Sequence, residues 1–130
     1  MEEKLYYYLC HSIPFGLKVN YNNDVYTLVG VNDYHEVLLE DSNGICQNYT
    51  VGIEDIKPYL RPMSSRSKEE IEEADNLELD LWNKLRLWKC ANLVDFYIKR
   101  HLDYEYCLID KGYAIKAPEG MYDSILKKMR

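Results

Sequence analysis

The chain has 130 residues, of which 47% are hydrophobic and 29% charged, and its formal net charge at pH 7 is −6. This length and composition are typical of one globular domain and exclude a disordered chain. No apolar run approaches the roughly 18 residues that are needed to cross a bilayer, so we expect a soluble protein that does not enter a membrane.

The N-terminus and the cysteines bear on the compartment. Residues 1–4 lack the basic stretch of a signal peptide, and the four cysteines are scattered without a C-x-x-C pair or a zinc-finger spacing. A chain that is large enough to form a core does not need disulfides in a reduced compartment. We therefore expect free thiols and a cytoplasmic location.

The charge is distributed unevenly. Residues 1–62 hold 4 basic and 9 acidic residues, a charge of −5, whereas residues 63–130 hold 12 and 13, a charge of −1. Because an acidic surface repels phosphate, residues 1–62 are a poor candidate for binding nucleic acid without sequence preference.

Short strands joined by tight turns are predicted in the first half of the chain. Leu17, Val19 and Tyr21 alternate with polar residues, and Asn-Asp and Asn-Gly turn signals separate the apolar runs that follow. Residues 53–56 are too few for a strand and predict a single 3₁₀ turn. The expected strands are 17–21, 25–31, 35–40, 45–51 and 57–61.

A meander of four strands, a 3₁₀ turn and a short final strand is the layout of SH3-like barrels such as Tudor and KOW modules. Upstream, Leu5 to Leu9 is predicted to be an additional strand, followed by a loop at Pro14. The sequence therefore predicts an α+β fold. It consists of an N-terminal SH3-like antiparallel small β-barrel (residues 1–62) and a helical C-terminal part (residues 63–130) packed on the barrel.

The hydrophobic pattern changes from a strand period to a helix period after the last strand. Pro58 and Pro62 suit an edge strand or a strand end, while Ser67 and Glu70 have the spacing of a helix capping box. The apolar residues of segment 71–91 then recur at steps of three and four, which predicts an amphipathic helix. An Asp-Asn pair within the segment leaves open whether it forms one helix or two.

Two further helices are predicted before the C-terminus. One spans residues 92–102 and has its first residue, an asparagine, as the N-cap. The other is a short helix over residues 104–111, capped by Asp103 and ended by Gly112 in the left-handed conformation. Residues 113–117 are apolar enough to dock back on the fold as an extended segment.

No catalytic signature is present. The chain lacks a nucleophile elbow, a phosphate-binding loop, a dinucleotide-binding glycine motif and a zinc-protease motif. His11, His35 and His101 share no local motif with an acid or a cysteine, and each is interpreted as a structural residue. We therefore predict no catalytic residue, no cofactor and no metal site. An enzyme would require a pocket that joins His35 or His101 to a carboxylate with a shifted pKa.

The chain contains 13 tyrosines but only 2 phenylalanines and 2 tryptophans. Tyrosine combines a rigid apolar ring with a polar tip and is enriched where proteins contact each other or where nucleic-acid bases stack. Alternatively, strands favour aromatic residues and a small barrel leaves their hydroxyls exposed. On the first interpretation, the candidate partner surface consists of Tyr49, Tyr59, Trp82 and Trp88.

The end of the chain is locally basic. It holds five cations against Glu119 and Asp123, and the cations are Lys111, Lys116, Lys127, Lys128 and Arg130. This pattern indicates either a solvated C-terminus or a patch that binds an anionic partner. A nucleic-acid-associated accessory factor is therefore the alternative to a protein-binding function.

A family resemblance is carried by Ile13–Val19, Ile56–Ser65, His101–Tyr104 and Leu108–Tyr122. These stretches resemble a group of proteins encoded by phages and integrated mobile elements of gut anaerobes. Residues 71–100 match that group least. The group has no established activity, so the resemblance implies an origin but no functional residues. We therefore expect a non-enzymatic interaction protein of phage or mobile-element origin whose partner is another protein.

Overall fold

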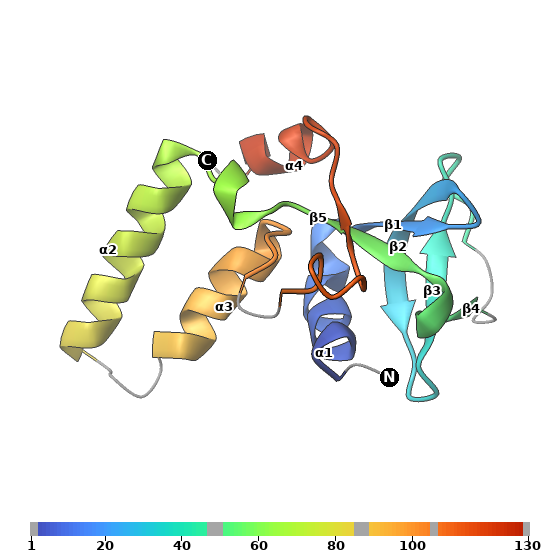
Figure 1. Cartoon of the computed structure of the whole chain (residues 1–130), viewed down its shortest axis with the longest axis horizontal. Helices are drawn as coiled ribbons and strands as arrows, with labels where there is room; N and C mark the ends of the chain where they lie inside the picture. The colour runs from blue at the N-terminus through green and yellow to red at the C-terminus, as the bar shows by residue number, and fades with distance from the viewer. Residues whose placement is uncertain (1–2, 47–50, 85–88, 105–106, 129–130) are drawn as a thin grey trace.

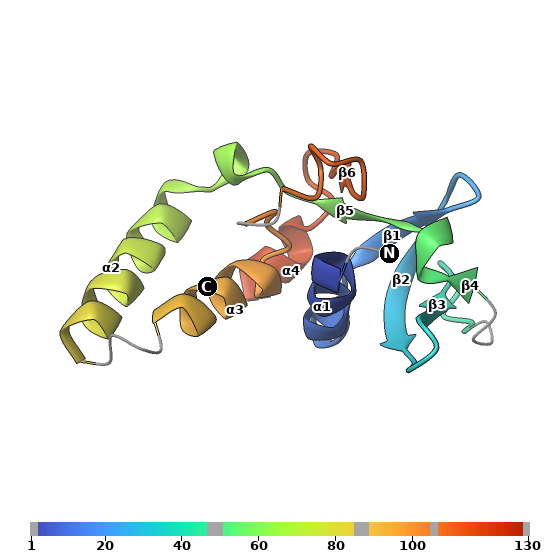
Figure 2. The same cartoon turned by 60° about the horizontal axis from the view of Figure 1, so that its bottom comes forward.

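The computed structural model describes residues 3–46, 51–84, 89–104 and 107–128. Within these ranges the protein is a mixed α+β fold, in which a six-stranded sheet lies at one end of a row of helices (Figure 1, Figure 2). The helices are α1 (Glu3–Ser12), α2 (Lys68–Lys84), α3 (Lys89–Lys99) and α4 (Asp123–Lys128). None of them is long and apolar enough to span a bilayer.

The sheet has the strand order β4-β3-β2-β1-β5-β6. Its strands are β1 (Lys18–Tyr21), β2 (Asp24–Val31), β3 (Glu36–Glu40), β4 (Val51–Gly52), β5 (Lys57–Leu60) and β6 (Ile115–Lys116). Asn22 and Asn23 join β1 to β2 with φ angles of 52° and 68°, the left-handed values that a two-residue hairpin requires. The 3₁₀ turn η2 (Ile53–Asp55) precedes β5. The predicted hairpin, 3₁₀ turn and final strand are therefore confirmed.

The described strands form an open sheet with β4 and β6 at its edges, and they do not close into a barrel. β6 pairs with β5 in parallel, through Tyr59 with Ile115 and Leu60 with Lys116, whereas the other neighbouring strands are antiparallel. The predicted docking of residues 113–117 is confirmed, because this segment supplies β6. The C-terminal part thus completes a sheet that the N-terminal part begins.

The predicted strand at Leu5–Leu9 is wrong, because these residues lie in helix α1. Leu5, Tyr8, Leu9 and Ser12 are buried, a spacing of three and four that puts them on one face of a helix. The run of aromatic residues resembled a strand, but burial along this face outweighs their β preference. The first element of the described residues is therefore a helix rather than a strand.

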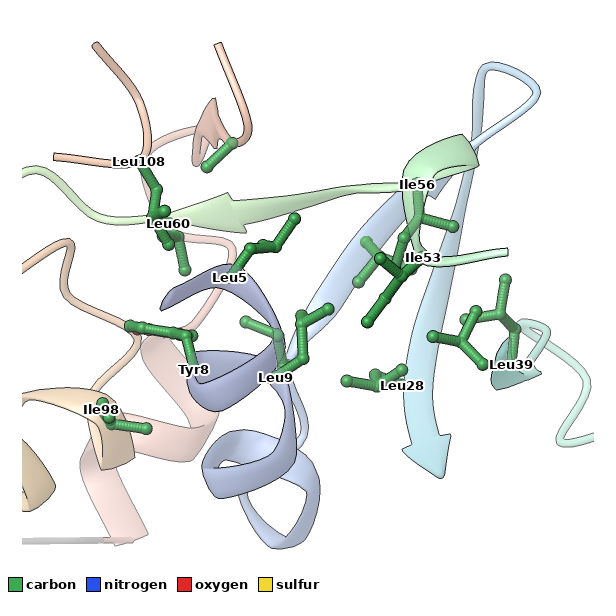
Figure 3. Packing of buried hydrophobic residues seen from close by; sticks show 14 of the residues in the cluster. Leu5, Tyr8, Leu9, Leu28, Leu39, Ile53, Ile56, Leu60, Ile98 and Leu108 are labelled. Atoms are coloured by element: carbon green, nitrogen blue, oxygen red, sulfur yellow. The ribbon is translucent and has the colours of Figure 1, made fainter. Parts of the chain in front are cut away.

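Helix α1 lies between the sheet and α3 and carries the centre of the core (Figure 1, Figure 3). Leu9 is fully buried among sheet residues such as Leu28, and the Tyr8 ring packs in the same cluster. The Tyr8 hydroxyl donates a hydrogen bond to the Leu102 carbonyl at 3.0 Å, which satisfies its polar tip inside the core. One apolar core is therefore shared by residues from both parts of the chain.

The C-terminal helices differ from the prediction in two places. Asn92 is not an N-cap, because α3 begins at Lys89 and includes it. Described residues between 104 and 111 form turns rather than a helix. There the Asp103 carboxylate accepts hydrogen bonds from the Leu108 and Ile109 N–H groups, at 2.9 and 3.0 Å, which closes a wider loop than a helix cap does.

Gly112 has the predicted left-handed conformation, with a φ of 83°, but it follows a turn rather than the predicted helix. The sequence left open whether segment 71–91 forms one helix or two. In the structure, α2 runs without interruption through Asp75 and Asn76 and ends at Lys84. Helix α3 then begins at Lys89, so the described residues form two helices. The short 3₁₀ turns η1 (Ile13–Phe15) and η3 (Met63–Ser65) complete the fold.

Candidate functional site

The exit from β5 is joined to the start of α2 by a capping box and an ion pair. The Ser67 hydroxyl accepts a hydrogen bond from the Glu70 N–H at 3.1 Å, and the Glu70 carboxylate accepts one from the Ser67 N–H at 2.9 Å. Two nitrogens of the Arg61 guanidinium also donate to the Glu70 carboxylate, at 2.9 and 2.6 Å. The capping box was predicted, whereas the part played by Arg61 was not.

The Arg61 and Glu70 side chains are 11% and 10% exposed, so their charges are largely removed from water. Burial acts to raise the pKa of Glu70, but the hydrogen bonds from Arg61 and Ser67 outweigh burial and hold that pKa below its ordinary value. Arg61 also donates to the carbonyls of Arg100 and Ser65, at 3.1 and 3.3 Å. Because the hydrogen-bonding groups of both residues are used within the chain, we assign the pair a structural role.

Tyr122 connects the C-terminal segment to two strands. Its hydroxyl donates to the Tyr59 carbonyl of β5 at 2.6 Å and accepts from the Lys18 N–H of β1 at 3.0 Å. Its ring lies against the His101 ring, with 4.2 Å between the ring centroids. Burial is the main reason that the pKa of Tyr122 is raised. Tyr122 therefore stays protonated and fixes the position of the chain between β6 and α4.

His101 is fully buried behind Tyr122. Its Nε2 lies 2.7 Å from the Phe15 carbonyl, which can only accept, so Nε2 carries the proton of the neutral ring. Nδ1 has no hydrogen-bond partner among the described residues. Burial lowers the pKa of His101 to about 4, against the Phe15 hydrogen bond, which acts to raise it. His101 is therefore a neutral structural residue at ordinary pH.

A groove with a volume of about 760 Å³ opens between two segments, residues 61–70 and residues 116–126. Pro62, Met121 and Leu126 line it and are each half-buried. Ser64 and Lys116 line it as exposed polar residues. Polar and charged side chains outnumber the apolar ones along the groove. Because it is concave and still offers apolar contacts beside hydrogen-bonding groups, we take this groove as the candidate functional site.

The other charged residues of the groove lie in the C-terminal segment. Glu119 and Asp123 are exposed and face the same space as Lys116. The Arg61–Glu70 pair contributes no net charge. The groove is therefore close to electrically balanced and lacks the excess of positive charge that phosphate binding requires.

The four residues of the predicted partner surface are not brought together in the described structure. Tyr59 lies in β5, is half-buried, and accepts a hydrogen bond from the Asn20 side-chain amide at 3.0 Å. It does not line the groove. Trp82 lies in α2, but its side chain is outside the description, and Tyr49 and Trp88 lie outside the described residues. The predicted surface therefore stays a prediction.

The groove residues were not found from the sequence. Met121 and Leu126 follow the Pro-Glu-Gly turn and carry no periodic signal, and Arg61 forms its ion pair across nine residues. Pro62 and Pro118 mark breaks in the hydrophobic pattern of the sequence. The pattern does not show that the segments around these prolines lie side by side. The parallel pairing of β6 with β5 and the hydrogen bonds of the Tyr122 hydroxyl bring them together.

Neither His35 nor His101 lines the groove, and His35 instead stacks on Tyr6 with ring centroids 4.3 Å apart. Across the described ranges, no group of three or more His, Cys, Asp or Glu side chains is arranged to hold a metal ion. No family model, curated protein or solved structure matches this chain. Any functional assignment must therefore start from the geometry of the described residues.

Proposed function

We propose that this chain is a non-enzymatic interaction protein and that its groove binds a short segment of a partner protein. The observation that carries the proposal is the groove of about 760 Å³, in which half-buried apolar side chains lie among a larger number of polar ones. Its most buried charges, Arg61 and Glu70, already neutralise each other. A bound segment would gain affinity from apolar burial against Met121 and Leu126, and orientation from hydrogen bonds to Ser64 and Lys116.

We also propose two points about fold and origin. The first is that the first five strands belong to the SH3-like class. The second is that the protein is of phage or mobile-element origin and acts in the cytoplasm. The strand order β4-β3-β2-β1-β5 and the 3₁₀ turn before β5 support the first point. The resemblance of residues 56–65 and 108–122 to phage-encoded proteins supports the second. Both of these stretches contribute residues to the groove. Because fold and origin do not assign an activity, the functional proposal depends on the groove.

A peptide-display selection tests the proposed function. The full chain is used to select binders from a random peptide library, and the binders are then measured against Ser64→Trp. Ser64 is exposed and makes no hydrogen bond with another described residue, so a tryptophan there fills the groove without disturbing the core. The matched control is Ser42→Trp, at an exposed serine in the turn after β3. We expect peptides that bind the chain and Ser42→Trp but lose about tenfold or more in affinity for Ser64→Trp.

If no selected peptide distinguishes the two tryptophan variants, the groove is not the binding site. The alternative function, a nucleic-acid-associated accessory factor, would appear as binding of labelled DNA or RNA that weakens steeply with salt and is lost in Lys116→Ala with Lys127→Ala. Flat titrations at low salt are expected, because the groove has little net charge.

A further inference from the structure

The loop between β2 and β3 exposes a tyrosine that the fold does not use. Tyr34 is 85% exposed, although a ring of this size normally contributes to a core or an interface. The backbone beneath it is fixed by Asn32, whose side-chain oxygen accepts hydrogen bonds from the Tyr34 and Glu36 N–H groups at 2.9 and 3.0 Å. We call residues 32–36 the tyrosine turn.

His35 anchors the tyrosine turn to two neighbouring elements. Its ring stacks on Tyr6 of α1, with centroids 4.3 Å apart and an angle of 10° between the planes. Its carbonyl accepts a hydrogen bond from the Ile53 N–H of η2 at 2.9 Å. The turn is thus held from two sides, and an aromatic side chain on a fixed backbone loses little conformational entropy when it binds.

The surface around the tyrosine turn is acidic. Residues 19–56 contain no lysine or arginine and seven carboxylates: Asp24, Asp33, Glu36, Glu40, Asp41, Glu54 and Asp55. Three of these are exposed and close to the turn. Asp33 belongs to it, and Glu54 and Asp55 directly follow Ile53, which is hydrogen-bonded to His35. The nearby cations are Lys4 of α1, which adjoins the oppositely charged Glu3, and the exposed Lys57, two residues after Asp55, so carboxylates remain in excess. Such a surface repels nucleic acid and attracts a basic protein.

We propose that the tyrosine turn and its neighbouring carboxylates are a second docking surface, separate from the groove, for a protein segment that places lysines or arginines around an apolar socket. Tyr34 is the aromatic anchor, and Asp33, Glu54 and Asp55 form the charged rim. This arrangement of a central aromatic contact within a polar rim is the usual anatomy of an interface hot spot. The inference rests on the proposed function as an interaction protein.

The same display selection tests this surface with different variants. Peptides selected on the full chain are measured against Tyr34→Ala and against the charge variant Asp33→Asn with Glu54→Gln. The controls are Tyr113→Ala, a partly exposed tyrosine next to β6, and Glu69→Gln with Glu72→Gln, two exposed carboxylates on α2 that give the same change in net charge. All six substituted residues are exposed, so each of the four variants is expected to fold, which circular dichroism checks.

We expect a pool of lysine- or arginine-rich peptides that lose about tenfold or more in affinity for Tyr34→Ala and several-fold for the charge variant. Their binding should weaken as salt rises, and neither control should change it. This pool should still bind Ser64→Trp, whereas groove peptides should still bind Tyr34→Ala, so the two proposals can fail separately. The absence of any Tyr34-dependent pool, or a pool without basic residues, would overturn the inference. A Tyr34-dependent dimer in sedimentation would overturn it too, because the occupant would then be a second copy of this chain.

Discussion

Two regions of the molecule, the apolar core around α1 and the polar network beside the groove, are held together by different forces. In the core, Leu5, Leu9 and Leu60 pack in one buried cluster (Figure 3). Beside the groove, Arg61 and Tyr122 hold backbone segments through directed hydrogen bonds to carbonyl groups. Apolar burial is non-directional and makes elements pack, whereas hydrogen bonds determine where segments lie. We therefore expect core changes to alter stability most and network changes to alter the groove as well.

The largest effect is expected in the core. Leu9→Ala removes a fully buried side chain and leaves a cavity between α1 and the sheet, so the free energy of unfolding should fall by about 3–4 kcal/mol. Urea denaturation measures this loss. The control Ile45→Ala, at a side chain that is 62% exposed, should change stability by no more than about 0.5 kcal/mol. A similar small loss for Leu9→Ala would mean that α1 does not carry the core.

The ion pair should come next. Arg61→Met leaves the Glu70 carboxylate buried without its main partner, and we expect a loss of about 3 kcal/mol. Adding Glu70→Gln removes the unpaired charge while keeping a residue that can complete the capping box, so the double variant should recover most of the loss. If the double variant is as unstable as Arg61→Met alone, the loss comes from packing rather than from charge.

The free energy of unfolding should fall at acidic pH because of His101. Its pKa is about 4 when folded and 6.5 when unfolded, so the unfolded chain binds more protons between these two pH values. Stability from this residue is therefore fully present above pH 6.5 and falls as pH drops, by about 2 kcal/mol near pH 5. Glu70 adds a loss only at lower pH, because its pKa lies below 4.5.

Urea denaturation at a series of pH values measures this slope. In His101→Phe, which keeps a ring against Tyr122 but removes the titrating group, the slope between about pH 6.5 and pH 5 should largely disappear. An unchanged slope in that variant would assign the acid sensitivity to other residues.

The smallest effect is expected for the hydroxyl of Tyr122. Tyr122→Phe keeps the ring but leaves the Lys18 N–H and the Tyr59 carbonyl without this partner, at a cost of about 1–2 kcal/mol. We also expect weaker binding of groove-selected peptides, since Tyr122 fixes one wall. The control Tyr113→Phe, at an exposed site, should be neutral in both measurements. If Tyr122→Phe kept full stability, the hydrogen bonds of the Tyr122 hydroxyl would not be what holds the chain between β6 and α4.

Local chemistry was enough to predict the first hairpin, the 3₁₀ turn before β5 and the start of α2, whereas most of the predicted strand 45–51 lies outside the described residues. The asparagines at the first hairpin, η2 and the Ser67–Glu70 capping box each depend on residues a few positions apart, so a sequence pattern can report them. The same kind of argument failed at α1, because the aromatic run is compatible with a strand until the burial of Leu5, Tyr8 and Leu9 on one side is known. It failed again after Asp103, where a carboxylate closes a loop instead of starting a helix.

The sequence by itself determined the α+β class, the first hairpin, the start of α2 and the acidic character of residues 19–56. Tertiary structure alone decided that β6 joins β5, that Tyr122 bonds to Lys18 across 104 residues, and that Met121 and Leu126 face Pro62 across a groove. The reason is physical. The hydrogen-bonding groups of a turn or a helix cap find their partners within one short stretch of chain, whereas the groove exists only where residues 61–70 and residues 116–126, which are distant in the sequence, bury polar groups against each other.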